Sequence, residues 1–266
     1  MNRENAADFI STKEYKRFKE FADSCKEFRY IGLCYGQPGV GKTFAAKHYT
    51  KWQSIEKAWL TQLMDATNKE DIKQCRAVFH TANVTNTPKR VQQQIRHKLF
   101  QFGNILAKAK GKTELSELLV DVEQSCPLLI VDEADNLTHQ SLEQLRAMYD
   151  KYGFGLILIG MPGIEKRLAR YPQLYSRVGF AHQFRTLSED EMIFIFEKHW
   201  EALGLEINKN EFSDVEAMKT IARITSGNFR LIQRIFAQIQ RLQKINKLKH
   251  IDADLVLAAR KCLVIG

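Results

Sequence analysis

Short apolar runs alternate along the chain with stretches in which apolar residues recur every three or four positions. The short runs are rich in β-branched and aromatic residues and predict buried strands, whereas the stretches between them predict amphipathic helices. The predicted strands are Arg29–Tyr35, Arg76–Ala82, Pro127–Val131, Gly155–Gly160 and Gly179–Phe184. This alternation is typical of an α/β fold, so we expect a doubly wound, mostly parallel five-stranded sheet.

Two of the intervening stretches are regular enough to interpret in detail. Residues 8–28 indicate a helix whose aromatic stripe either joins the core, which such a stripe favours, or closes over a bound ligand. A basic helix begins at Pro88, and its apolar face consists of Val91, Ile95, Leu99 and Phe102. Residues 54–74 are polar and give no clear prediction.

The last part of the chain is helical in pattern throughout. Ser188 and Glu191 have capping-box spacing, and Asp252 is suited to open the final helix. The apolar face of one predicted helix consists of Ile232, Ile235, Phe236, Ile239 and Leu242. We therefore expect an α/β domain over residues 1–186 and a small all-helical lid domain over residues 187–266.

The clearest chemical motif is a phosphate-binding loop, G-x-x-x-x-G-K-[ST], between the first predicted strand and a predicted helix. Its glycines let backbone N–H groups turn toward phosphates, its lysine reaches the β- and γ-phosphates, and its threonine hydroxyl suits Mg²⁺. A glycine-rich turn without a ligand is the alternative, and the flanking strand and helix argue against it. The expected ATP-binding residues are Gly36, Gln37, Pro38, Gly39, Val40, Gly41, Lys42, Thr43 and Phe44.

Two acidic residues follow the third predicted strand. Since ligands bind at the carboxyl ends of parallel strands, Asp132 is placed to hold Mg²⁺ and Glu133 to orient and deprotonate a water. A solvated acidic turn is the alternative, which the phosphate-binding loop earlier in the chain disfavours. These residues predict an ATPase, with Lys42 and Glu133 as catalytic residues and residues 1–186 as the nucleotide-binding domain.

The chain is basic, with 40 Lys and Arg against 31 Asp and Glu and a net charge of +9. This charge indicates nucleic acid as a partner first and an anionic membrane surface second, although it could serve solubility alone. The sequence has neither a signal-peptide pattern nor an apolar run of membrane-spanning length, so we expect a cytoplasmic protein. Free thiols in a reducing compartment are expected for Cys25, Cys34, Cys75, Cys126 and Cys262, which lack C-x-x-C spacing.

The phosphate-binding loop, the Asp-Glu pair, two further strands and a helical lid together resemble an AAA+ ATPase over nearly the whole chain. Within that superfamily, Ile130–Leu137 and Leu158–Leu168 are similar to transposition regulators of the MuB, TnsC and TniB type. This resemblance implies a protein that forms a ring or helical filament on double-stranded DNA in its ATP state. It also implies a transposase as partner, together with a targeting protein in some cases.

The resemblance assigns two arginines. Ser176-Arg177 is similar to the box that holds an arginine finger, which reaches the γ-phosphate of a neighbouring subunit. Arg230, in Gly227–Arg230, is similar to the sensor 2 arginine that contacts bound nucleotide. For each arginine a surface salt bridge is the alternative role. The rivals for the finger are Arg167, Arg170 and Arg185.

One position departs from the AAA+ pattern. The fourth predicted strand runs into Met161, where many AAA+ proteins carry the polar sensor 1 residue. Because a thioether cannot orient a water as an amide or hydroxyl can, we expect ATP hydrolysis to be slow or partner-stimulated.

The expected DNA contacts follow from charge and from the resemblance. The channel-facing residues would be Lys89, Arg90, Lys110, Lys112 and Thr113, binding the phosphate backbone without sequence specificity. A solvated charged face is the alternative reading of these residues.

Two other functions compete with transposition. The first is an AAA+ replication initiator or loader, which usually carries an additional DNA-binding domain. The second is a small-molecule P-loop kinase, which leaves the Ser-Arg box and the helical lid unexplained.

Overall fold

The computed structural model describes residues 9–61, 66–111, 126–202, 211–246, 248 and 250–263. Its backbone divides into two compact units. The first unit comprises Tyr15–Gly36 and Lys42–Phe184, and the second comprises the chain up to Glu14, Gln37–Gly41 and the chain from Arg185 onward. The boundary between the main blocks therefore falls at residues 184 and 185, and the phosphate-binding loop is shared between the two units.

The first unit contains an α/β fold built around a five-stranded sheet in the order β2-β3-β4-β1-β5, with every pairing parallel. The predicted fold class is confirmed. Its strands are β1 (Ile31–Tyr35), β2 (Val78–Thr81), β3 (Leu128–Asp132), β4 (Gly155–Gly160) and β5 (Val178–Gln183). The inner strands β3 and β4 are buried at every residue, whereas the edge strand β5 alternates partly buried with exposed positions.

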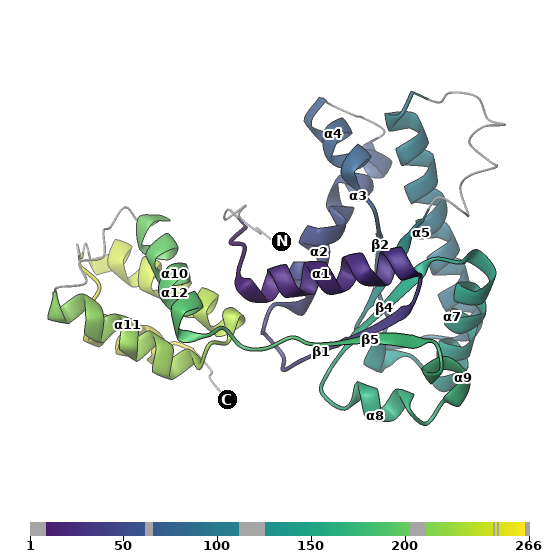
Figure 1. Cartoon of the computed structure of the whole chain (residues 1–266). Helices are drawn as coiled ribbons and strands as arrows, with labels where there is room; N and C mark the ends of the chain where they lie inside the picture. Colours follow the sequence, from purple (N-terminus) through teal and green to yellow (C-terminus); the bar gives the residue numbers. More distant parts are fainter. Residues whose placement is uncertain are drawn as a thin grey trace. The chain divides into compact units, whose positions relative to one another are not determined.

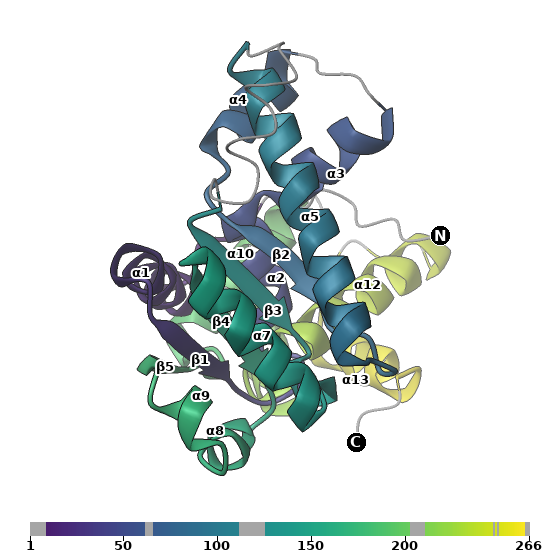
Figure 2. The same cartoon turned by 90° about the vertical axis from the view of Figure 1, so that its right-hand side faces the viewer.

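Helices cover both faces of this sheet. In Figures 1 and 2, α1 and α2 lie on one face, and α5 and α7 pack together on the other. The helical segments of the unit are α1 (Lys13–Phe28), α2 (Lys42–Thr50), α3 (Trp52–Thr61), α4 (Ala66–Gln74), α5 (Pro88–Ala109), η1 (Ala134–Asn136), α7 (His139–Tyr152), α8 (Ile164–Leu168) and α9 (Pro172–Tyr175). The aromatic stripe of α1 lies in the core, since Phe18 is fully buried and meets the rings of Tyr49, His182 and Phe184.

The helix predicted from Pro88 is α5, and its four predicted apolar residues are all buried. Thr87 caps it, because its side chain accepts a hydrogen bond from the Arg90 N–H at 3.3 Å. The polar stretch that gave no prediction forms α3 and α4, which pack against α5 (Figure 2). The sequence also predicts a helix that carries Leu115, Leu118, Leu119 and Val122, and these residues lie outside the described part of the chain.

The second unit is helical, with α10 (Glu189–Ala202), α11 (Phe212–Thr225), α12 (Phe229–Asn246) and α13 (Ala253–Lys261) around one apolar core. The capping box at Ser188 and Glu191 forms: the Ser188 N–H donates to the Glu191 carboxylate at 3.0 Å, and the Glu191 N–H donates to Ser188 Oγ at 3.4 Å. The predicted face of α12 supplies Ile232, Ile235, Phe236 and Ile239 to the core. None of the helices in the described residues is long and apolar enough to cross a membrane.

Candidate nucleotide-binding site

The lysine of the phosphate-binding loop is held at the end of β1. Lys42 begins α2, and its ammonium donates to the Gly36 carbonyl at 2.5 Å. Burial lowers its pKa, whereas Cys34 and the carboxylates of Asp132, Glu133 and Asp135 act in the opposite direction. A phosphate bound here would add negative charge beside this buried cation.

Glycine is required at several points of the loop. Gly39 and Gly41 have φ angles of 85° and 111°, in the left-handed region that side chains with a Cβ rarely adopt. Gly36 lies against the backbone of Phe184, whose N–H donates to the Tyr35 carbonyl at 2.7 Å, so that a Cβ there would clash. The motif therefore has the backbone curvature that its sequence predicts.

Asp132 and Thr43 lie together at the carboxyl end of β3. The Asp132 carboxylate is 3% exposed, and burial raises its pKa, although a hydrogen bond from Thr43 and the charges of Lys42 and Lys47 oppose that shift. A buried carboxylate short of compensating charge, next to a hydroxyl, is a donor set that fits Mg²⁺. Within the described residues no group of three or more His, Cys, Asp or Glu forms a metal cluster, and Mg²⁺ beside phosphates needs only one or two protein ligands.

Glu133 follows directly on the strand in an uncommon backbone conformation. Its φ of 55° is left-handed, which costs a residue with a side chain about 1 kcal/mol, and its side chain is exposed. The conformation turns the chain sharply after Asp132 into η1. Strain of this kind is concentrated at functional sites, which agrees with the predicted role of Glu133.

Asp135 fixes the sensor 1 position, a contact that the sequence analysis missed. Its Oδ2 accepts a hydrogen bond from the Met161 N–H at 2.6 Å. Gly160 makes the approach possible, because a Cβ there would lie 2.5 Å from the same oxygen. The backbone at Met161, rather than its side chain, therefore connects the end of β4 to the Asp-Glu turn.

In the second unit, the sensor 2 motif contacts the phosphate-binding loop. The Arg230 N–H donates to the Gly39 carbonyl at 2.9 Å, and the Asn228 side chain donates to the Pro38 carbonyl at 2.9 Å. The Arg230 side chain itself is exposed. Asn228 was not singled out from the sequence, although its position one residue after Gly227 in the motif was the available signal.

The candidate finger arginines differ in their partners. Arg177 forms a forked ion pair with Asp150, with Nε–Oδ1 at 2.7 Å and Nη2–Oδ2 at 3.0 Å. Arg167 donates to the backbone carbonyls of Asp135 and Leu137 and so holds α8 against the Asp-Glu turn. Arg170 and Arg185 have exposed side chains.

The predicted DNA contacts do not all lie together. Lys89 and Arg90 are exposed neighbours in the first turn of α5, while Lys110 is exposed at its far end. Twenty residues of helix separate Arg90 from Lys110, which at 1.5 Å per residue is about 30 Å. Lys112 and Thr113 lie outside the described residues.

Comparison with known proteins now identifies the family. A family model described as an AAA domain matches residues 26–168, more than half of the chain. The chain belongs to the AAA domain family. This AAA protein is 45% identical over 271 residues to a potential ATP-binding protein of Staphylococcus aureus, covering 97% of each chain.

A more distant relative carries a functional name. The chain is 28% identical over 243 residues to the Mu-like prophage FluMu DNA transposition protein B of Haemophilus influenzae, covering 87% of this chain and 72% of the relative. The structure is similar to the Thermotoga maritima RuvB Holliday junction branch migration motor, with a TM-score of 0.61, 17% identity and coverage of 97% of this chain and 71% of that one. The likeness to RuvB shows the fold alone. The AAA+ assignment and the relation to transposition protein B are thereby confirmed.

Proposed function

We propose that this AAA protein is an ATP-hydrolysing, DNA-binding regulator of transposition, which oligomerises on target DNA in its ATP state and recruits or activates a transposase. The observation that carries the proposal is the similarity to DNA transposition protein B over 87% of the chain. The loop geometry and the net charge of +9 support it, since they suit a triphosphate and a polyanion.

The residues of the first unit take complementary roles in hydrolysis. Lys42 binds the β- and γ-phosphates, and Glu133 orients the attacking water and accepts its proton. Thr43 and Asp132 hold Mg²⁺, which when bound neutralises charge on the phosphates. Arg230 contacts the nucleotide as a sensor 2 arginine, and Arg177 stabilises the transferring phosphoryl group of a neighbouring subunit. Because Met161 offers no polar side chain to the water, turnover is slow until a partner assists.

The decisive experiment measures ATP binding, ATP turnover and duplex DNA binding together. We expect Lys42→Ala to lose ATP affinity and, with it, ATP-dependent DNA binding. Glu133→Gln should bind ATP and DNA normally and lose turnover by about 10²-fold or more, because only the group that aligns the water is removed.

Two results would contradict the proposal at different points. Unchanged ATP affinity in Lys42→Ala would remove the phosphate-binding loop from the mechanism. Intact ATP binding and turnover without any ATP-dependent association with duplex DNA would leave an ATPase and remove the transposition role.

A further inference from the structure

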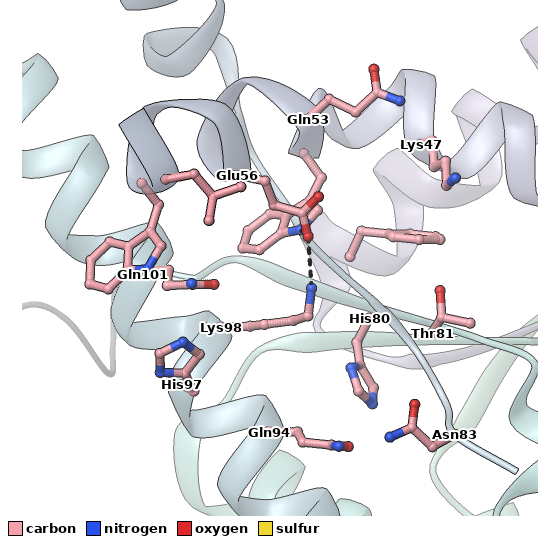
Figure 3. A pocket seen from close by; sticks show the side chains of 14 residues that line it. Lys47, Gln53, Glu56, His80, Thr81, Asn83, Gln94, His97, Lys98 and Gln101 are labelled. Carbon is pink, nitrogen blue, oxygen red and sulfur yellow. Dashed lines mark hydrogen bonds and ion pairs between the residues drawn. The ribbon is translucent and has the colours of Figure 1, made fainter. Parts of the chain in front are cut away.

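A pocket of about 570 Å³ lies along the outer edge of β2, and no residue of the phosphate-binding loop lines it. It is bounded by α2, α3 and α5, and Figure 3 shows the side chains that these elements turn toward it. A volume between roughly 300 and 1,000 Å³ is typical of small-molecule sites. Of the residues named above in the nucleotide site, Lys47 lines this pocket, and its charge also acts on Asp132.

The pocket contains a buried histidine without a partner. His80, on β2, is 4% exposed, and neither of its ring nitrogens has a hydrogen-bond partner among the described residues. Figure 3 shows its imidazole between the side chains of Gln94 and Asn83. Burial, with a smaller contribution from Lys98, lowers its pKa to about 4, so the ring is neutral at physiological pH. In the neutral ring one nitrogen can donate a hydrogen bond and the other can accept one. Burying both without partners costs free energy, unless a ligand supplies an acceptor for the first and a donor for the second.

The formal charges of the lining are largely balanced within it. Glu56 accepts from Trp52 Nε1 at 2.6 Å and from Lys98 Nζ at 3.1 Å. The Lys98 ammonium also lies 4.8 Å from the centre of the Trp52 ring. Lys47 lines the side formed by α2. Beyond Lys47, the lining therefore has little free charge with which a charged ligand could form an ion pair.

Uncharged polar groups and aromatic rings supply the rest of the lining. The amides that line it are Gln53, Asn83, Gln94 and Gln101. Trp59 and Phe79 add aromatic walls. Amides and a neutral imidazole both donate and accept hydrogen bonds, so they suit a ligand that carries donor and acceptor atoms side by side. Aromatic walls favour a flat apolar ring that can stack on them.

We propose that this pocket binds a nucleobase, held by hydrogen bonds from His80 and Gln94 at its polar edge and by the aromatic walls at its ring. The base could belong to a free nucleoside or to an unpaired DNA strand, since both offer the same chemistry. No residue of the phosphate-binding loop lines this site, and its existence does not depend on the proposed transposition role.

The test uses the full-length protein with its phosphate-binding loop saturated by a non-hydrolysable ATP analogue. Adenosine, guanosine, cytidine and thymidine are titrated in one arm, and a short single-stranded oligonucleotide and its duplex in the other. Two of the three tryptophans, Trp52 and Trp59, line the pocket, so binding should change tryptophan fluorescence, and calorimetry gives the affinity. We expect saturable binding of a nucleoside, of the single strand, or of both.

Variants locate the binding. His80→Leu and Gln94→Leu should each weaken it by about tenfold or more, because a site built to hydrogen-bond its ligand loses one partner. The matched control is His199→Leu, which removes a partly buried histidine of the helical unit whose buried Nε2 has no partner among the described residues. His199→Leu should leave the affinity unchanged. Gln94, partly exposed on α5, keeps the test valid if His80→Leu fails to fold.

The outcomes separate clearly. Sensitivity to both pocket variants in the nucleoside arm assigns a nucleoside site, and the same sensitivity in the single-strand arm alone assigns an unpaired base. The proposal is overturned if neither nucleosides nor single strands bind at millimolar concentration. It is equally overturned if they bind with affinities that neither pocket variant changes.

Discussion

Burial fixes the charge of His80 and thereby makes the stability of the fold depend on pH. Its pKa is lowered from 6.5 to about 4, chiefly by burial, so the folded state resists a protonation that the unfolded chain accepts. The contribution to stability is therefore complete above pH 6.5 and is lost as the pH falls toward 4. Burial also lowers the pKa of His48 and His199, which adds to the same trend.

Between pH 7 and pH 5, the free energy of unfolding should fall by about 2 kcal/mol on account of His80 alone, as 1.36 kcal/mol per pKa unit implies. Urea denaturation at both pH values measures it, and His80→Leu should be correspondingly less sensitive to acid. Gln94→Leu, which removes a neighbouring polar group that does not titrate, should keep the sensitivity of the parent. Equal pH dependence in His80→Leu and the parent would contradict the assignment.

At the scale of single elements, Glu191 joins two segments far apart in sequence. One carboxylate oxygen accepts from the Ser188 N–H and hydroxyl at the start of α10, and the other accepts from the buried N–H of Glu14 at 3.2 Å. The side chain is 9% exposed. Losing it removes a helix cap and the buried hydrogen bond to the Glu14 N–H.

We therefore expect Glu191→Ala to lower the free energy of unfolding by about 2 kcal/mol, combining a lost cap with a lost buried hydrogen bond. Glu189→Ala is the matched control, because Glu189 lies exposed in the first turn of the same helix. The control should change stability by less than about 0.5 kcal/mol. Thermal or urea unfolding distinguishes the two, and similar stabilities for both variants would refute the role of Glu191.

The elements also show which features the sequence could predict. The strands and α5 were predictable, because buried runs and a 22-residue amphipathic helix repeat their pattern many times. Helices α3 and α4 were not predictable, since helices of ten and nine residues repeat an apolar spacing only two or three times among polar neighbours.

The nucleotide-binding site likewise combines predictable and unpredictable features. The loop and the Asp-Glu pair are local motifs, whereas the contact of Asp135 with Met161 and the pairing of Arg177 with Asp150 join residues brought together only by folding.

At the scale of the whole molecule, the pairing of Arg177 with Asp150 bears on assembly. An arginine that is bound to a carboxylate by two hydrogen bonds must break this ion pair before it can reach a neighbouring subunit. The side chains are 32% and 35% exposed, so the pair is screened by solvent and release is feasible. A finger role and a resting ion pair are therefore compatible in successive states.

Mixing experiments separate these roles. Arg177→Ala subunits have an intact loop and Lys42→Ala subunits have an intact finger, so together they should recover part of the ATPase activity if Arg177 acts across a subunit boundary. Asp150→Ala is the control, since it removes the ion pairs of Asp150 with Arg177 and Arg146 and keeps both arginines, and it should remain active alone. Inactivity of Asp150→Ala would assign the pair a structural role. No recovery on mixing, at concentrations that support assembly, would redirect the search to Arg170.

The predicted path of DNA runs over the start of α5. Lys89 and Arg90 lie exposed together at the start of α5, about 30 Å along the helix from Lys110, so one stretch of backbone phosphate could engage the pair without engaging the far end. Phosphate contacts release counterions, and each contributes nearly one unit to the slope of log K against log salt. Replacing Lys89 and Arg90 together by glutamine should therefore flatten that slope by about two units per subunit that contacts DNA, with ATP affinity unchanged.

The control for net charge is the double variant Lys16→Gln with Lys19→Gln, which removes the same charge from the exposed face of α1. An equal slope change in both double variants would mean that overall charge alone attracts DNA, and an unchanged slope in the α5 variant would place the DNA path elsewhere.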